Sequence, residues 1–366
     1  MPTVILSPCG TSTLTNGTAS EVRTLLTQTA DCQAADLSPE QHQVISHHLQ
    51  IREQHLLNAD PVTATQLSAE LNGILRYAQG QAPAASDVHI LLASDTFQGQ
   101  ATARLIQTWL QRYGCTVWVE TIADLNVRSA DSFHLAMGAL VTWAETIFPS
   151  YQAQRYRIVF NLTGGFKSVN GFLQTLGMFY ADECIYIFQG SQELLRIPRL
   201  PIKLDPSEVI GAHVQTFRRL SQGSLGRREC FGIPDIFLFQ LEGHDQVALS
   251  EWGQLIWQRC KHHYYRQQLW DPLSPRLAFS SGFLGTIQDL DGDRLALINE
   301  RLDQLSRCLD SAHSYNPRSL DFKKLQGDPR PPSTHECDAW SDQDARRLFG
   351  HFADGVFVLD ALGKHL

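Results

Sequence analysis

The chain has 366 residues, of which 43% are hydrophobic, 9% aromatic and 19% charged. At about 150 residues per domain, this length predicts two or three domains, and the composition excludes a disordered chain. The formal charge is -8, from 30 Lys and Arg against 38 Asp and Glu, which excludes a broad basic surface for nucleic acid.

The cysteines indicate whether a metal site is expected, and the start of the chain indicates whether a signal peptide is expected. Eight scattered cysteines form no CxxC pair, so we expect reduced thiols, no metal and no cofactor. The first residues lack the charged and apolar regions of a signal peptide, and no run of about 18 apolar residues occurs. We therefore expect a soluble, cytoplasmic protein without a membrane partner.

Residues 1–200 alternate short β-branched runs with helical patterns. The runs predict strands at 3–6, 88–93, 115–120, 156–161 and 185–188. Helices are predicted from Ser38-Pro39 to about Asn58, from Pro61, and at 99–112, 131–147 and 167–180. Such alternation predicts an α/β fold, with a mostly parallel sheet and helices on both faces.

The rest of the chain divides at the prolines of WDPLSP, residues 270–275. Residues 201–273 predict a helical, winged-helix-like connector, with helices near 207–220 and 249–268 and a strand near 236–241. Residues 274–366 predict a strand at 276–280, a helix at 291–313 and a meander of short strands. We expect this last region to be a small α+β domain.

Small polar loops with glycine follow three of the predicted strands. The first holds Ser7, Gly10, Thr11, Ser12 and Asn16, the second Ser94, Asp95 and Thr96, and the third Asn161, Thr163, Gly164, Gly165, Phe166 and Lys167. Any one of these loops is more simply explained by steric needs at a turn. Together they favour an anion site, because ligands bind beyond the carboxyl ends of such strands and Lys167 is the first lysine in the chain. The spacing is not that of a P-loop.

These segments, SPCGTSTLTN, LLASDTFQGQATARL and NLTGGFKS, resemble three motifs of the CARF domain, the CRISPR-associated Rossmann-type sensor of cyclic oligoadenylates. The resemblance covers about residues 1–200. It implies a homodimer that binds one cyclic oligoadenylate across its twofold axis, with cyclic tetra-adenylate as the preferred ligand. The loop residues above would line that site, with Gln189 after the fifth strand as a further candidate.

The C-terminal region offers two interpretations as a ribonuclease. Arg346 to His351 fits RxxxxH, the helical motif of HEPN ribonucleases, although Asp354-Gly355 between apolar runs predicts a hairpin there instead. Residues 274–366 as a whole resemble the RelE/ParE toxin superfamily. That resemblance implies a metal-independent endoribonuclease that cleaves mRNA on the ribosome.

The RelE resemblance also suggests catalytic candidates. Cleavage through the ribose 2′-OH needs a base, an acid and positive charge for the phosphorane. Lys323 and Lys324 match the family's basic loop, Arg347 would stabilise the transition state, and Arg318 and Arg346 would contact phosphate. Lys364 and His365 match the closing basic pair, and His365 or His351 is a candidate acid.

The resulting hypothesis is a ribonuclease of type III CRISPR antiviral defence that cyclic oligoadenylate activates. Three alternatives remain open: a ring nuclease that degrades its ligand with Ser12 and Lys167, a ligand-gated regulator that binds DNA through 201–270, and a HEPN-type ribonuclease. The near-neutral charge of 201–270 argues against DNA.

Overall fold

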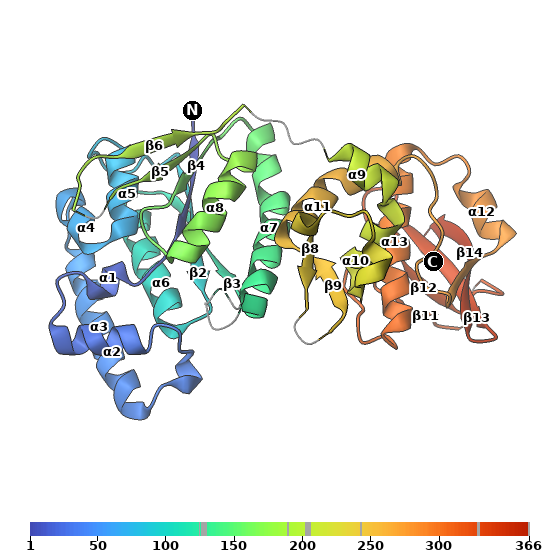
Figure 1. The fold of residues 1–366 in the computed structure, drawn as a ribbon, viewed down its shortest axis with the longest axis horizontal. Helices are drawn as coiled ribbons and strands as arrows, with labels where there is room; N and C mark the ends of the chain where they lie inside the picture. The colour runs from blue at the N-terminus through green and yellow to red at the C-terminus, as the bar shows by residue number, and fades with distance from the viewer. Residues whose placement is uncertain are drawn as a thin grey trace. The chain divides into compact units, whose positions relative to one another are not determined.

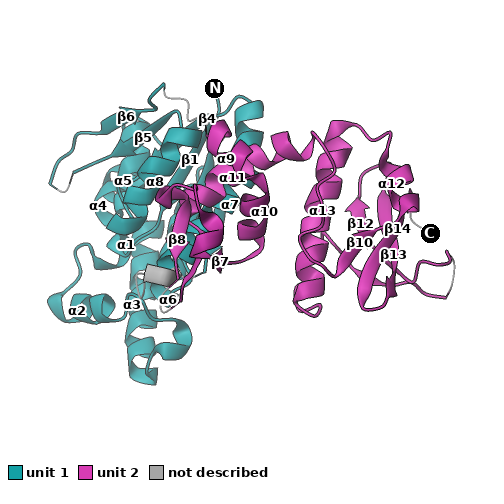
Figure 2. Ribbon diagram, turned by 45° about the vertical axis from the view of Figure 1, so that its right-hand side comes forward, with its two compact units in different colours: residues 1–203 teal, residues 204–366 magenta. Residues whose placement is uncertain are grey.

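The computed structural model describes residues 1–123, 125, 130–188, 190–201, 206–241, 244–327 and 330–364, with the backbone alone at 130–132. The chain forms two compact units, Met1–Lys203 and Leu204–Leu366, shown in different colours in Figure 2. In the described part of the chain, no helix is long and apolar enough to span a bilayer.

The first unit is built on a six-stranded sheet in the order β3-β2-β1-β4-β5-β6. Its strands are β1 (Thr3–Pro8), β2 (Val88–Ser94), β3 (Thr116–Ile122), β4 (Arg157–Asn161), β5 (Glu183–Tyr186) and β6 (Leu195–Pro198). The first five are parallel, as the sequence predicts, and β6 adds an antiparallel edge that the sequence analysis does not predict. β1 pairs with both β2 and β4, so the strand order reverses between β1 and β4.

Helices cover both faces of this sheet (Figure 1). They are α1 (Ser12–Thr15), α2 (Ser20–Gln28), the 3-10 turn η1 (Ala34–Asp36), α3 (Pro39–Leu57), α4 (Pro61–Leu67), α5 (Ala69–Tyr77), α6 (Phe97–Gln111), α7 (Ala130–Ala153) and α8 (Lys167–Tyr180). Val159 packs in one core cluster with residues of α5 and α6, whereas the next residue, Phe160, stacks near Phe148 of α7. Successive residues of a strand point to opposite faces, so α5 and α6 lie on one face and α7 on the other.

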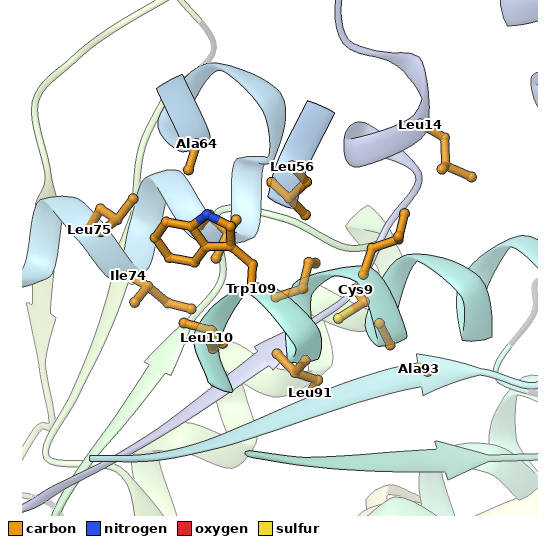
Figure 3. Close-up of a cluster of buried hydrophobic side chains, with 14 of the residues drawn as sticks. Cys9, Leu14, Leu56, Ala64, Ile74, Leu75, Leu91, Ala93, Trp109 and Leu110 are labelled. Atoms are coloured by element: carbon orange, nitrogen blue, oxygen red, sulfur yellow. The ribbon is translucent and has the colours of Figure 1, made fainter. Parts of the chain in front are cut away.

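The buried side of α6 illustrates how this core is held (Figure 3). Trp109 is fully buried among Leu56, Ile74 and Leu75, and its indole N–H donates to the Ala59 carbonyl at 3.2 Å. A buried tryptophan needs such an acceptor because an unpaired N–H in an apolar core is costly. This packing fixes α3, α4 and α5 against α6, and α5 thereby reaches the ends of β1 and β4.

The second unit begins with short elements. They are α9 (Ser207–Ala212), α10 (Val214–Gln222), β7 (Leu225–Gly226), η2 (Arg227–Cys230), η3 (Asp235–Phe237), β8 (Leu238–Gln240), β9 (Gln246–Leu249) and α11 (Glu251–Tyr265). The strands form a small antiparallel sheet in the order β7-β9-β8. The single helix predicted near 207–220 is divided at His213 into α9 and α10, and the predicted strand near 236–241 begins with a 3-10 turn.

A five-stranded sheet follows. Its elements are β10 (Leu277–Phe279), α12 (Ser281–Ile287), α13 (Gly292–Asp310), β11 (Lys323–Lys324), β12 (His335–Trp340), β13 (Arg346–Ala353) and β14 (Val356–Lys364), with strand order β10-β14-β13-β12-β11. β10 is parallel to β14 and the other pairs are antiparallel. Asp354 and Gly355 have φ of 49° and 82°, which confirms the predicted hairpin turn. Arg346 and His351 thus lie on a strand, and the helical context of the HEPN motif is wrong.

A buried ion pair joins the two parts of the second unit. Arg218 of α10 donates to Asp303 of α13 at 2.6 Å, with both side chains essentially buried, and Tyr265 of α11 also donates to this carboxylate. Burial raises the pKa of Asp303, while the guanidinium of Arg218 opposes that shift. Residues 206–273 therefore pack against the α13 domain through charge as well as through apolar side chains.

Candidate functional site

The reversal of strand order places two glycine loops together at the carboxyl edge of the first sheet. Gly10 follows β1 and Gly165 follows β4. A Cβ on Gly10 would lie 3.1 Å from the Gly165 amide nitrogen, and Gly165 itself has φ of 84°. Glycine is required at these two positions, because a side chain on either would force the loops apart. In open α/β sheets this crevice is the usual place for a ligand.

Glu70, in the first turn of α5, braces both loops and was missed by the sequence analysis. Its Oε1 accepts the Gly10 N–H at 2.9 Å, and its Oε2 accepts the hydroxyls of Ser12 and Ser68 at 2.9 and 2.7 Å. The side chain is fully buried. Three donors satisfy the buried carboxylate, which would otherwise be strongly destabilising.

This contact corrects one expectation about the first loop. The resemblance implies that Gly10 lines the ligand site, but its N–H donates to Glu70 and is therefore not available to a phosphate. The Ser12 hydroxyl is occupied as well, because it donates to Glu70 and accepts the Ala69 N–H at 3.0 Å. The loop is therefore held in shape by an internal carboxylate.

Four further predicted ligand contacts are buried inside the scaffold. Asn161 donates to the Ser7 hydroxyl at 3.1 Å and to the Glu70 carbonyl at 2.9 Å, and both Ser7 and Asn161 are fully buried. Ser94 is buried against the Thr96 hydroxyl at 2.9 Å. Thr96 is buried too and caps α6 by accepting the Gly99 N–H. These residues shape the loops and do not face solvent.

Of the predicted residues, Lys167 is exposed, and those that are partly exposed are Thr11, Ser12, Asn16, Asp95, Thr163, Gly165 and Phe166. Thr11 and Asn16 line a depression of about 360 Å³ with Thr15, Gly17, Arg23 and Thr27. Asp95 is half-buried, and it accepts Gln33 Nε2 at 3.1 Å. Gln189 falls outside the described residues.

Lys167 is the first residue of α8, directly behind Gly164, Gly165 and the half-buried Phe166. Its side chain is exposed, and no carboxylate pairs with it among the described residues. Thr163, in the same loop, has a buried hydroxyl oxygen with no hydrogen-bond partner. That hydroxyl faces Gly73 of α5, so it is not open to a ligand. A helix N-terminus and an ammonium group without a carboxylate partner together provide what an anionic ligand needs.

The catalytic candidates of the C-terminal region fall into separate groups. Lys323 and Arg347 lie together, but among carboxylates: Arg347 contacts Asp321, Glu336 and Asp338 at 3.4, 3.2 and 3.0 Å. Lys323 also pairs with Asp321, and its ammonium group holds the pKa of that carboxyl below its usual value. Two cations among three carboxylates leave an excess of negative charge, which does not suit a phosphate.

His351 has a different environment. Its Nδ1 lies 2.9 and 3.0 Å from the carboxylate oxygens of Asp360, and this carboxylate accepts the Ser333 hydroxyl at 2.8 Å. His351 lies three residues after Leu348, which packs in the core, so the alternation of the strand places His351 on the opposite face. The register shift at Phe349 and Gly350 leaves Asp360 as the extra residue of β14. A carboxylate that orients an imidazole is the usual arrangement of a general base or acid.

The remaining candidates are dispersed. Arg346 pairs with Asp344 at 3.1 Å and lies opposite Lys364 in the strand register. Lys324 lies opposite His335, and Arg318 is exposed. His365 falls outside the described residues. In the described ranges, no three His, Cys, Asp or Glu side chains are grouped to hold a metal ion.

The fold and the crevice define an α/β unit with a candidate anion site at its switch point. Residues 65–200, which include Glu70 and Lys167, match the model of a CRISPR-associated protein family, Cas_APE2256. No curated protein matches the chain. Among solved structures, the chain is similar to Enterococcus italicus Csm6 bound to cyclic hexa-2′-fluoro-hexa-dAMP, with 12% identity and a TM-score of 0.28 over 87% of this chain. It spans 58% of that protein's chain.

Proposed function

We propose that residues 1–200 bind a cyclic oligoadenylate, cyclic tetra-adenylate in the first instance, and that binding activates an endoribonuclease in residues 274–366. The observation that carries the first half is the unpaired Lys167 at the start of α8, beside the Gly10–Gly165 contact at the switch point. The match of residues 65–200 to a CRISPR-associated family supports the choice of cyclic oligoadenylate as the ligand class. Residues 201–273 are the connector in this proposal.

The phosphates of the ligand make the main contacts with the protein. Lys167 and the first N–H groups of α8 attract them, and Thr11 and Asn16 stand at the rim of the neighbouring depression. A cyclic ligand with internal symmetry is best bound by two copies of the same loops, so the sensor acts as a homodimer. Glu70 keeps the loop after β1 in shape while the ligand is absent.

The nuclease half rests on the helices α12 and α13 followed by an antiparallel meander, which is the order that the RelE resemblance implies. His351 is the favoured base or acid, because Asp360 orients its Nδ1 and leaves Nε2 for substrate. As base, His351 takes the proton of a ribose 2′-OH, whose oxygen attacks the adjacent phosphorus. The bond from phosphorus to the 5′-oxygen breaks, water protonates the leaving oxygen, and a 2′,3′-cyclic phosphate remains. The substrate is mRNA on the ribosome, in the cytoplasm.

The decisive experiment uses the full chain with mRNA on stalled ribosomes and with free RNA, each with and without cyclic tetra-adenylate. Cleavage only with both ligand and ribosome is expected. Loss of cleavage in His351→Ala, with ligand affinity unchanged, would assign the chemistry to the C-terminal region. Intact mRNA with cyclic oligoadenylates of every ring size would refute the proposal.

Ring-nuclease activity is a second candidate, because the Ser12 hydroxyl donates to the Glu70 carboxylate and Lys167 is free. Incubating the radiolabelled ring alone with the protein tests it. Linear products that vanish in Ser12→Ala and persist in His351→Ala would support the sensor as a second catalytic site. An unchanged ring after many hours would exclude it.

A further inference from the structure

A second cavity, in the C-terminal region, has walls suited to a flat ring. It has a volume of about 410 Å³ and is lined by Arg276, Leu309, Ala312, His313, Phe352 and Gly355. This volume falls within the usual range of small-ligand sites. None of these six residues belongs to the catalytic candidates named above.

Two rings in its wall are nearly parallel. The rings of His313 and Phe352 have an interplanar angle of 18° and centroids 6.5 Å apart. Bases in a nucleic-acid strand are spaced by about 3.4 Å, so this separation is close to twice one stacking step. Phe352 is 43% exposed, and His313 is exposed as well.

His313 has a backbone conformation that is unfavourable for most residues. Ala312 and His313 follow α13 with φ of 48° and 70°, a left-handed conformation that is uncommon for residues other than glycine. The left-handed conformation of Ala312 is the ordinary end of a helix, so only that of His313 requires its surroundings to enforce it. Here the His313 N–H donates to the Cys308 carbonyl at 2.9 Å, and its ring packs on Phe322.

Further aromatic rings and two cations complete the surroundings. Behind the slot, His335 and Phe357 lie 5.2 and 5.0 Å from Phe352, centroid to centroid. Lys324 lies opposite His335 in the sheet. The pKa of His335 is below its usual value, mainly because the ring is partly buried and also because the positive charge of Lys324 is near. In the described part of the chain, no carboxylate pairs with Lys324 or with Arg276, so both are available to phosphates.

The geometry points to a nucleobase-binding slot between His313 and Phe352, which takes one base of a single-stranded RNA while Lys324 and Arg276 contact its backbone. This inference rests on the proposed function, since it supplies a binding subsite for the RNA substrate. Stacking on two aromatic faces tolerates any base, so the slot selects unpaired RNA and not a sequence.

The test is binding of a ten-nucleotide 2′-O-methyl RNA carrying one 2-aminopurine to the full chain without activator. The modification removes the attacking hydroxyl, and stacking quenches the fluorophore. We expect quenching, and about tenfold weaker binding in His313→Asn and Phe352→Leu. Asn tolerates the left-handed backbone, and Leu preserves the apolar packing. Phe231→Ala, which removes a 90% exposed ring elsewhere, is the matched control and should not change binding.

The cation is tested separately by salt titration. Lys324→Met should reduce the slope of log affinity against log salt by about 0.7, the value for one phosphate contact on a single strand. Absent quenching, or equal affinity in His313→Asn, Phe352→Leu and the native chain, would overturn the slot even if activated cleavage persists. Quenching without any activated cleavage would instead refute the proposed function and leave the slot standing. AMP binding as tightly as the strand would overturn the assignment to RNA.

Discussion

Gly164 lies so close to Glu70 that a Cβ on the glycine would overlap the carboxylate oxygen Oε1. That oxygen also accepts the N–H of Gly10, so a single buried carboxylate touches the loops after both β1 and β4. The two loops cannot move independently of Glu70. We therefore expect a shift of one loop to displace Glu70 and, through it, the other loop.

Gly164→Ala should weaken ligand binding by the first unit. The added methyl group displaces the carboxylate and breaks its bonds to Gly10 and Ser12, each of which is a charge-assisted bond worth about 1.5–3 kcal/mol. We expect cyclic tetra-adenylate affinity to fall at least about tenfold in isothermal titration calorimetry. Gly171→Ala on α8 is the control, because a Cβ there meets nothing within 4 Å. Equal losses in the two variants would contradict this role of Glu70.

Lys167→Met should weaken ligand binding through charge alone. The lysine has no carboxylate partner among the described residues, so its removal costs little stability. Affinity should fall about tenfold at low salt, and the difference should shrink as salt screens the phosphates. Arg112→Met is the matched control, since Arg112 caps the far end of α6. If the loss of affinity did not depend on salt, Lys167 would contribute through packing and not through its charge.

His89 makes the first unit sensitive to acid. It lies on β2 without exposure, both ring nitrogens lack partners, and burial lowers its pKa to about 4. The unfolded chain binds a proton near pH 6.5 and the folded chain does not, so stability is lost as the pH falls from 6.5 to 4. The loss amounts to about 3 kcal/mol. The protection factors of the β2 amides, which correct the exchange rates for the intrinsic rate at each pH, should fall over this range, and His89→Val should abolish most of that fall.

Asp338→Asn should strengthen RNA binding. Neutralising one of the three carboxylates around Arg347 leaves two negative charges against the two positive charges of Lys323 and Arg347. Partly exposed pairs contribute about 0.2–1 kcal/mol, so the full chain should bind single-stranded RNA up to about fivefold more tightly. Asp289→Asn makes the same change of charge on an exposed loop and should have less effect. Unchanged or weaker binding in Asp338→Asn would mean that this cluster does not meet RNA.

Local patterns in the sequence were sufficient to predict much of the fold. The helix at 167–180 is present at those bounds, and Ser38 caps α3 as predicted, because both signals lie within one turn of the helix. The added antiparallel strand β6 and the break at His213 were missed, since neither has a distinct local pattern.

The site was harder to predict, because its contacts join distant segments. Glu70 is 60 residues from Gly10 in sequence, and an acidic residue in the first turn of a helix is ordinarily explained by the helix dipole. Only the adjacent Ser68 cap hinted at a buried helix start. Arg347 was chosen for its charge, and its three carboxylates come from strand register that no local pattern specifies. The His351–Asp360 pair likewise depends on a bulge in β14.

The ion pair between Arg218 and Asp303 makes the stability of the C-terminal region depend on residues 206–273. Cutting the chain between α11 and β10 and losing the first piece would remove Arg218 and Tyr265, the two side chains that bond the Asp303 carboxylate, and would uncover the face of α13 that α10 and α11 pack against. The severed C-terminal region should therefore be less stable than it is in the intact chain.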